Sequence, residues 1–226
     1  MSFSVSDACL QLGLRAGAII FRNVRVTAAG PDLRTEIARE VELIRASYPG
    51  LQAIRSIPEV AGFRELLWRV HVSPRKEPPS IERLLTFILK RRDLPAINNL
   101  VDAYNLVSVR TMCSLGAHDL DRIALPLELR LLTGREMFTP LRRSIATPVV
   151  AGEYGYVDAR DRVLCRLDLL QAEFSKVTEA TTNALVIVEG TKVHTLDALG
   201  EAFAETIGVL TRYCGGTAEM VAIPHN

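Results

Sequence analysis

The sequence predicts an α+β fold, built as one compact domain with a sheet-rich core flanked by amphipathic helices. The 226 residues are enough to bury one sizeable core, and 48% of them are hydrophobic. Helical spacing of apolar residues dominates the first half of the chain, whereas short alternating runs dominate the middle. Because no internal repeat or low-complexity linker interrupts the chain, we expect residues 1–226 to form a single domain.

The first half of the chain predicts one strand followed by helices. Gly17–Thr27 is rich in β-branched residues with partial alternation, which is typical of a strand. Ser80 precedes one of the amphipathic segments and is a candidate N-cap. Apolar residues at three- and four-residue spacing predict helices over Pro31–Tyr48, Pro58–Val72, Ile81–Arg92 and Asn99–Val109.

The second half predicts strands and one closing helix. Ser114–Asp121 is polar and has turn chemistry, and Asp158–Asp161 has the composition of a hairpin turn. Thr195–Cys214 is amphipathic and ends at two glycines, and Ala218–Ile223 follows as a possible last strand. Short apolar or alternating runs predict further strands at Leu125–Leu132, Glu153–Val157, Arg162–Leu167 and Ala184–Glu189.

Composition and charge exclude several classes of protein. Lys and Arg total 27 against 26 Asp and Glu, so the formal charge of +1 excludes whole-chain polycation binding and disorder. No apolar run approaches the ~18 residues of a membrane span, and the first ten residues lack the pattern of a secretory signal, so we expect a soluble, cytoplasmic protein. Of the 27 basic residues 23 are Arg, which suits phosphate binding, although compositional bias of the genome explains the same excess.

Common catalytic and cofactor motifs are absent from the sequence. There is no P-loop, no G-x-S-x-G and no G-x-G-x-x-G after a strand, so we expect no nucleotide cofactor. The cysteines and histidines are too scattered for a metal site, and we expect no metal. Asp119 and Asp121 could serve as an acid and a base, but two short acids in a turn more often act as caps.

Two stretches in the second half carry a resemblance to a known family. Leu94–Arg143 contains L-P, then V-D-x-x-N, D-L-D, L-E-L-R and T-P-L-R-R, and Gln171–Glu189 contains S-K-V-T-E, T-T-N and a strand. In this order the motifs resemble the tRNA-editing domain of the bacterial phenylalanyl-tRNA synthetase beta subunit, which is formed by its third and fourth modules. The resemblance covers roughly residues 55–190 and implies a β-sandwich-like core in a freestanding relative of that domain.

The resemblance implies hydrolysis of mischarged tRNA in trans, with tyrosine attached to tRNA for phenylalanine as the first substrate to test. Such an ester is labile, so a catalyst need only orient a water molecule and stabilise the developing oxyanion. The absence of an evident Ser or Cys nucleophile is compatible with this reaction. The alternatives are a tRNA- or RNA-binding module that has lost hydrolysis and an amino-acid-binding protein that uses the same pocket.

Five residues are carried over as candidates for the site. Asn105 matches the Asn of V-D-x-x-N, and Glu173 stands two residues before the Ser of S-K-V-T-E, where a carboxylate could recognise the polar end of the substrate. Two positions depart from the family: Tyr104 replaces a Thr, and Gly116 replaces the His that is associated there with editing. His118 could substitute for that His, oriented by the adjacent Asp119 and titrating near neutral pH. The plainer interpretations are a surface His and a solvated loop carboxylate.

Basic residues in three clusters are the candidates for tRNA contact. If these clusters converge they form a phosphate-binding face, although solvated helix ends explain each of them equally well. The clusters are Arg75 with Lys76, then Lys90 with Arg91 and Arg92, and Arg142 with Arg143.

Overall fold

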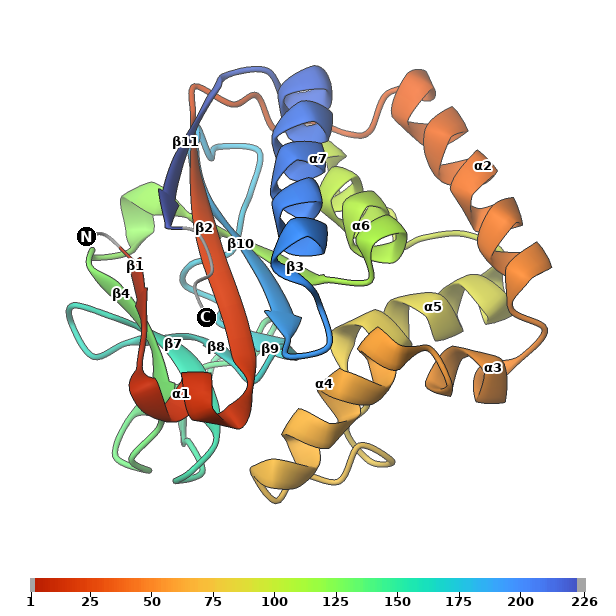
Figure 1. The fold of residues 1–226 in the computed structure, drawn as a ribbon. Coiled ribbons are helices and arrows are strands. Elements are labelled where there is room, and N and C mark those ends of the chain that lie inside the picture. The colour runs from red at the N-terminus through yellow and green to blue at the C-terminus, as the bar shows by residue number, and fades with distance from the viewer. Residues whose placement is uncertain (1–2, 223–226) are drawn as a thin grey trace.

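Two β-sheets pack against each other, and helices α2–α7 gather on one side of them, whereas the short helix α1 lies at the other side (Figure 1). The computed structural model describes residues 3–222. Buried residues of both sheets and of the helices belong to one large hydrophobic cluster, and a smaller cluster lies near Phe138. The prediction of an α+β fold with a sheet-rich core and flanking helices is therefore confirmed.

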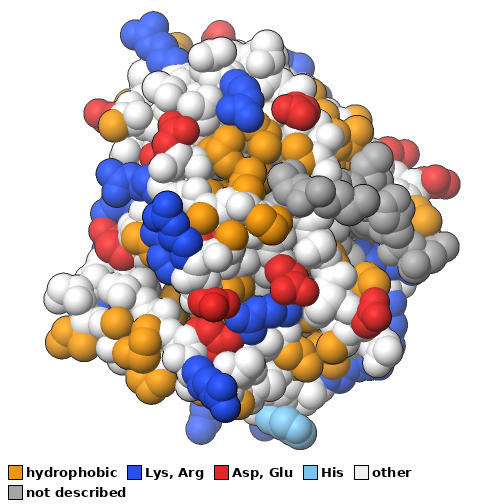
Figure 2. Space-filling view, turned by 90° about the vertical axis from the view of Figure 1, so that its left-hand side faces the viewer, with side chains coloured by type: hydrophobic (Ala, Val, Ile, Leu, Met, Phe, Trp, Pro, Cys, Tyr) orange, Lys and Arg blue, Asp and Glu red, His pale blue; other side chains and the backbone are white. Residues whose placement is uncertain are grey.

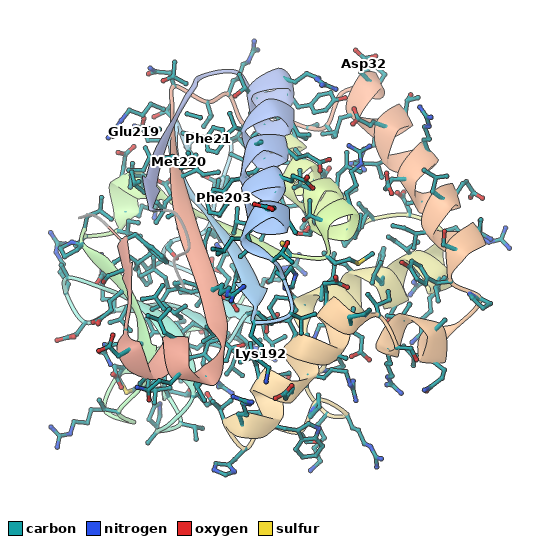
Figure 3. All side chains as sticks on the ribbon, in the orientation of Figure 1. Phe21, Asp32, Lys192, Phe203, Glu219 and Met220 are labelled. Carbon is teal, nitrogen blue, oxygen red and sulfur yellow. The ribbon has the colours of Figure 1, made fainter. Side chains whose placement is uncertain are left out.

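The first sheet is antiparallel and has four strands in the order β11-β2-β10-β3. Helices α6 and α7 lie side by side over one face of this sheet (Figure 1). Phe203 of α7 is buried and lies on the side of the helix that faces the sheet (Figure 3). The strands span β2 Leu14–Arg22, β3 Ser114–Asp119, β10 Asn183–Thr191 and β11 Thr217–Ala222.

The second sheet has five strands in the order β1-β4-β7-β8-β9, with only the β1–β4 pair parallel. Phe3 and Tyr156 of this sheet stack with ring centroids 6.2 Å apart inside the core. The strands span β1 Phe3–Val5, β4 Leu127–Leu131, β7 Tyr154–Asp158, β8 Val163–Arg166 and β9 Leu170–Gln171; a separate ribbon pairs β5 Met137–Phe138 with β6 Thr147–Pro148.

The predicted helices are present, with ends within a few residues of the predicted ones. Thr195 caps the last of them by accepting a hydrogen bond from Ala198 N. None of the helices within residues 3–222 is long and apolar enough to cross a membrane. The helices span α1 Asp7–Leu12, α2 Pro31–Ser47, α3 Leu51–Arg55, α4 Pro58–Arg69, α5 Ser80–Arg91, α6 Asn99–Thr111 and α7 Leu196–Cys214.

A buried carboxylate joins three of these helices. Glu82 of α5 is 1% exposed and accepts hydrogen bonds from Arg55 Nε at 2.8 Å and from Arg64 Nη1 at 2.6 Å. These arginines belong to α3 and α4, so the ion-pair cluster fixes α5 against both helices. Because α5 forms one wall of the cavity described below, this cluster also positions the candidate site.

Two local predictions are wrong. Ser114–Asp121 is not a turn: it forms β3 and a short 3-10 helix, Leu120–Arg122, because β10 supplies the hydrogen-bonding partner for a polar, glycine-containing segment. Ser80 is not an N-cap: it is the first residue of α5, and Pro79 occupies the cap position without a side-chain hydrogen bond. The last strand ends at Ala222, and Ile223 lies outside the described residues.

Charged side chains of both signs are mixed on the molecular surface. Figure 2 shows Lys and Arg interspersed with Asp and Glu on one face, separated by small hydrophobic patches. This mixing agrees with the near-zero formal charge. A continuous basic surface does not occupy that face.

Candidate functional site

A cavity of about 330 Å³ lies beside β3, the edge strand of the four-stranded sheet. Its walls come from α5, α6, β3 and the β8–β9 segment, with Leu141 at one side. The polar residues that line it are Ser80, Arg83, Tyr104, Asn105, His118, Asp168 and Gln171. A largely apolar cavity with a few convergent polar groups is the usual form of a small-molecule site.

One face of α5 forms the first wall. Ser80, Arg83, Leu84 and Phe87 line the cavity, and their spacing of three and four residues places them on the same side of the helix. The start of α5 is held by Asp168, whose Oδ2 accepts hydrogen bonds from Ser80 N and Ser80 Oγ, both at 3.1 Å. A residue 88 positions away in sequence therefore takes the role of a helix cap.

Strand β3 forms the second wall with Leu115, Gly116 and His118. Ser114, Gly116 and His118 share one face of the strand because side chains alternate with a period of two. Ser114 pairs in register with Glu189, whose carboxylate contacts Tyr156 in the other sheet, so this face is directed between the two sheets. A methyl group added at Gly116 would meet no atom within 4 Å. The position where the sequence resemblance implies a His is thus open around its Cα.

Helix α6 supplies Tyr104 and Asn105. The Asn105 side chain lines the cavity, is 7% exposed and has no hydrogen-bond partner among residues 3–222. The Tyr104 hydroxyl likewise has no partner among the described side chains, and burial raises the pKa of Tyr104. A buried amide without a partner is costly unless a ligand or water satisfies it, so Asn105 is available to bind one.

The V-D-x-x-N motif explains how α6 is positioned. Asp102 has a fully buried side chain whose Oδ1 accepts a hydrogen bond from Ile97 N at 2.9 Å. Its Oδ2 accepts one from Arg34 Nη2 of α2 at 2.7 Å. Burial nevertheless raises the pKa of Asp102. The Asp therefore fixes the start of the helix, and the Asn, three residues later and almost one turn away, faces the cavity.

His118 is the last residue but one of β3 and is 2% exposed. Its Nδ1 is 3.0 Å from Ser175 Oγ, and its Nε2 has no partner among the described residues. Burial lowers the pKa of His118 to about 4, so the ring is neutral at pH 7. The expectation of a loop His that Asp119 orients and that titrates near neutral pH is therefore wrong: consecutive strand residues point to opposite faces, and Ser175 orients the ring instead.

Asp119 and Asp121 have the structural, hydrogen-bonding roles that their sequence pattern favours over acid–base catalysis. Asp119 accepts hydrogen bonds from Asp121 N at 3.1 Å and from Thr181 Oγ1 at 2.7 Å. Asp121 accepts one from Asn183 Nδ2 at 3.1 Å. These contacts join the end of β3 to the start of β10.

Glu173 does not line the cavity with Asn105 and His118. It borders a neighbouring pocket, where Oε2 accepts a hydrogen bond from Arg142 N at 2.8 Å and Oε1 pairs with Lys176. The Lys176 ammonium, and then the Arg142 N–H, lower the pKa of Glu173, which is thus ionised at neutral pH. The catalytic and substrate-binding roles of Glu173 stay predictions. Its position places it at the neighbouring pocket and not at the cavity of His118.

The basic clusters lie in different parts of the molecule. Arg75 and Lys76 are exposed in the loop before α5, whereas Lys90, Arg91 and Arg92 lie at its far end. With 1.5 Å of rise per residue, the two ends of α5 are about 17 Å apart. Arg142 and Arg143 are exposed beside Leu141, and Arg142 borders the neighbouring pocket. The first two clusters therefore flank the α5 wall from opposite ends.

Sequence reasoning missed several residues around the cavity. Asp168, Gln171 and Arg83 line it, and Gln171 Nε2 donates a hydrogen bond to Ala117 O at 2.7 Å. None of them has a local sequence signal, because each contact depends on tertiary packing. Ser175 is the exception, since it is the Ser of S-K-V-T-E and could have been paired with a polar group.

Residues 3–222 contain no cluster of three or more His, Cys, Asp and Glu side chains that could hold a metal ion. Cys165 lines the cavity, but burial raises the pKa of its thiol. Since the thiolate is the nucleophilic form, Cys165 is poorly suited to covalent catalysis. The chemistry available in the cavity is thus that of a neutral imidazole, amide and hydroxyl groups, the Arg83 guanidinium and the Asp168 carboxyl group.

The fold and cavity define an α+β domain of two packed sheets with a polar-lined pocket at one sheet edge. The B3/4 domain model matches residues 62–201, so the chain belongs to the B3/4 domain family. The chain also matches the crystal structure of an N-terminal fragment of the phenylalanyl-tRNA synthetase beta subunit from Pyrococcus horikoshii, with a TM-score of 0.52 and 14% identity. This match covers 99% of the chain and 54% of the fragment, so the chain spans about half of that structure's length. No curated protein matches the chain.

Proposed function

We propose that the protein binds the aminoacylated 3′ end of tRNA and hydrolyses mischarged aminoacyl-tRNA in trans. The observation that carries this proposal is the convergence of a neutral His118 and an unpartnered Asn105 on one cavity. Membership of the B3/4 domain family supports the choice of substrate class. Tyrosine attached to tRNA for phenylalanine is the first substrate to test.

His118 is the proposed general base. In the tautomer that the reaction needs, Nδ1–H donates to Ser175 Oγ and leaves Nε2 free to accept a proton from water. Asn105 donates from its amide to the ester carbonyl, where negative charge develops. A low pKa makes His118 a weak base, which is sufficient because an aminoacyl ester is activated.

In this proposal the exposed arginines and lysines bind the phosphates of the tRNA. Arg142 and Arg143 lie beside the cavity, and the clusters at the two ends of α5 extend the contact to more distant phosphates. Because each cluster is small and the protein is nearly neutral, the affinity should be moderate and should fall as salt is raised.

The test is deacylation of labelled Tyr-tRNA for phenylalanine by the purified protein. We expect His118→Gln to lower the rate by about two orders of magnitude and Asn105→Ala to lower it by about one. His71→Gln is the matched control, since His71 is exposed and does not line the cavity. Equal rates for all four proteins would reject this site assignment.

The open space at Gly116 favours a second candidate function, binding of tRNA without hydrolysis. Filter binding to tRNA across a salt series identifies that function when deacylation is absent. Binding of a free amino acid without binding of tRNA would instead indicate the third alternative, an amino-acid-binding protein.

A further inference from the structure

A second pocket, of about 200 Å³, adjoins the cavity. The two share Tyr104, Leu141 and Gln171, so these three side chains separate adjacent compartments. The remaining wall of the second pocket is mainly apolar, with charged groups at its rim. It is formed principally by Ile97, Val101, Arg142, Glu173, Lys176 and Val177.

Apolar side chains are exposed around this pocket. Ile97 is 59% exposed and Leu141 is 39% exposed, although both carry large hydrophobic side chains. With Val101 and Val177 they form an apolar surface next to the polar cavity. Exposed apolar surface that borders a pocket is typical of a ligand-binding site, and these aliphatic side chains can cover the apolar face of a planar ring.

Two cations lie at the rim of the pocket and share one carboxylate. Glu173 accepts from the Arg142 N–H and pairs with Lys176, while the guanidinium of Arg142 makes no ion pair with any residue between 3 and 222. Arg142 has a left-handed backbone with φ of 61°, and the hydrogen bond to Glu173 holds it. The rim therefore has an excess positive charge, which favours a phosphate.

We propose that this second pocket binds the nucleotide that carries the ester. The base rests on the apolar surface of Ile97, Val101 and Val177, and the phosphate pairs with Arg142 and Lys176. The ribose then lies at Tyr104, so the aminoacyl group enters the cavity of His118. This inference rests on the proposed function, and it gives Glu173 the role of a positioning residue that holds the Arg142 segment.

Direct binding of 5′-AMP, adenosine and ribose 5-phosphate, measured by calorimetry, tests the proposal without any hydrolysis. We expect 5′-AMP to bind more tightly than either part alone. Lys176→Gln should weaken 5′-AMP binding about three- to five-fold, as expected for loss of one exposed charge pair, and leave adenosine binding unchanged. Val177→Phe should fill the pocket and weaken the binding of both 5′-AMP and adenosine.

Lys192→Gln is the matched control. Lys192 is 49% exposed and pairs with Glu65 at 2.9 Å, much as the 44% exposed Lys176 pairs with Glu173, but it lies just beyond the end of β10 near α4 (Figure 3). Absence of saturable 5′-AMP binding, or equal binding by the wild type and the Lys176→Gln and Val177→Phe variants, would overturn the proposal. If the protein deacylates Tyr-tRNA but does not bind 5′-AMP at this pocket, the proposed function stands and the nucleotide pocket is refuted. If it binds 5′-AMP at this pocket but does not deacylate Tyr-tRNA, the nucleotide pocket stands and the proposed function is refuted.

Discussion

Burial of His118 predicts a measurable loss of stability in mild acid. Its pKa is about 4 in the folded chain, against an ordinary value of 6.5. Between these values the unfolded chain binds a proton at this ring and the folded chain does not, so the free energy of unfolding decreases as the pH falls. At about 1.4 kcal/mol per pH unit, the 2.5-unit difference corresponds to about 3 kcal/mol between pH 6.5 and pH 4.

The assay compares urea unfolding of the wild type with that of His118→Gln at pH 6.5 and pH 5. We expect the stability advantage of the wild type over the variant to shrink by about 1–2 kcal/mol between these pH values, because a glutamine side chain does not titrate. His71→Gln, which changes an exposed ring, should track the wild type at both pH values. A difference between wild type and His118→Gln that does not change with pH would refute the buried, neutral state of the ring.

The comparison must be made between variants because Glu189 opposes His118. Glu189 is 2% exposed, and burial, followed by the charge of Asp168, raises its pKa to about 8. The folded chain therefore keeps a proton at Glu189 that the unfolded chain has released, and this contribution to stability decreases as the pH rises from 4.5 to 8. The two slopes partly cancel in the wild type, whereas the difference between wild type and His118→Gln isolates the His.

Three further predictions concern the site and its support. Ser175→Ala should lower the deacylation rate about ten-fold with little change in KM, and Ser175→Thr should restore much of it; equal rates would show that Ser175 does not orient His118. Glu82→Ala should lower the free energy of unfolding by about 3–5 kcal/mol in urea titrations, because two arginines lose a buried partner, and a loss below about 1 kcal/mol would contradict that burial. Gly116→His should fold with near-wild-type stability, since a Cβ at this position meets no atom within 4 Å and the residue lines the cavity; a large loss of stability would show that the cavity cannot accept the ring.

The helices could be predicted because each has a strong local pattern. Apolar spacing located α2, α4, α5, α6 and α7 to within a few residues. Strand β3 could not be predicted from the sequence, because Ser114–Asp119 contains polar residues and Gly116 and lies at a sheet edge. Its extended conformation is imposed by β10, and a segment stabilised by a partner roughly 70 residues away has no signal of its own.

Residues of the candidate site could be predicted from the sequence only where they belong to a motif. Tyr104, Asn105, Gly116 and His118 were identified from two motifs, and the structure places all four on one cavity. Their roles stay predictions. Asp168 could not be identified, because its contacts with Ser80 join segments 88 residues apart and no local pattern encodes such a pairing.

The cavity is one of the places where polar groups of residues 3–222 lack a protein partner; Ser108 Oγ, Tyr154 Oη and Glu189 Oε1 are also buried without a hydrogen bond and lie outside it. Among the described residues, most buried carboxylates are paired with arginine, as Glu82, Asp102, Glu136, Glu153 and Asp158 are. Asn105, the Nε2 of His118 and the Tyr104 hydroxyl lack protein partners, yet all three meet at one cavity. Folding alone gains nothing from such a gathering, since each unpaired group costs free energy unless water or a ligand satisfies it. A ligand with both donors and acceptors, such as an aminoacyl ester with its attacking water, would satisfy all three at once.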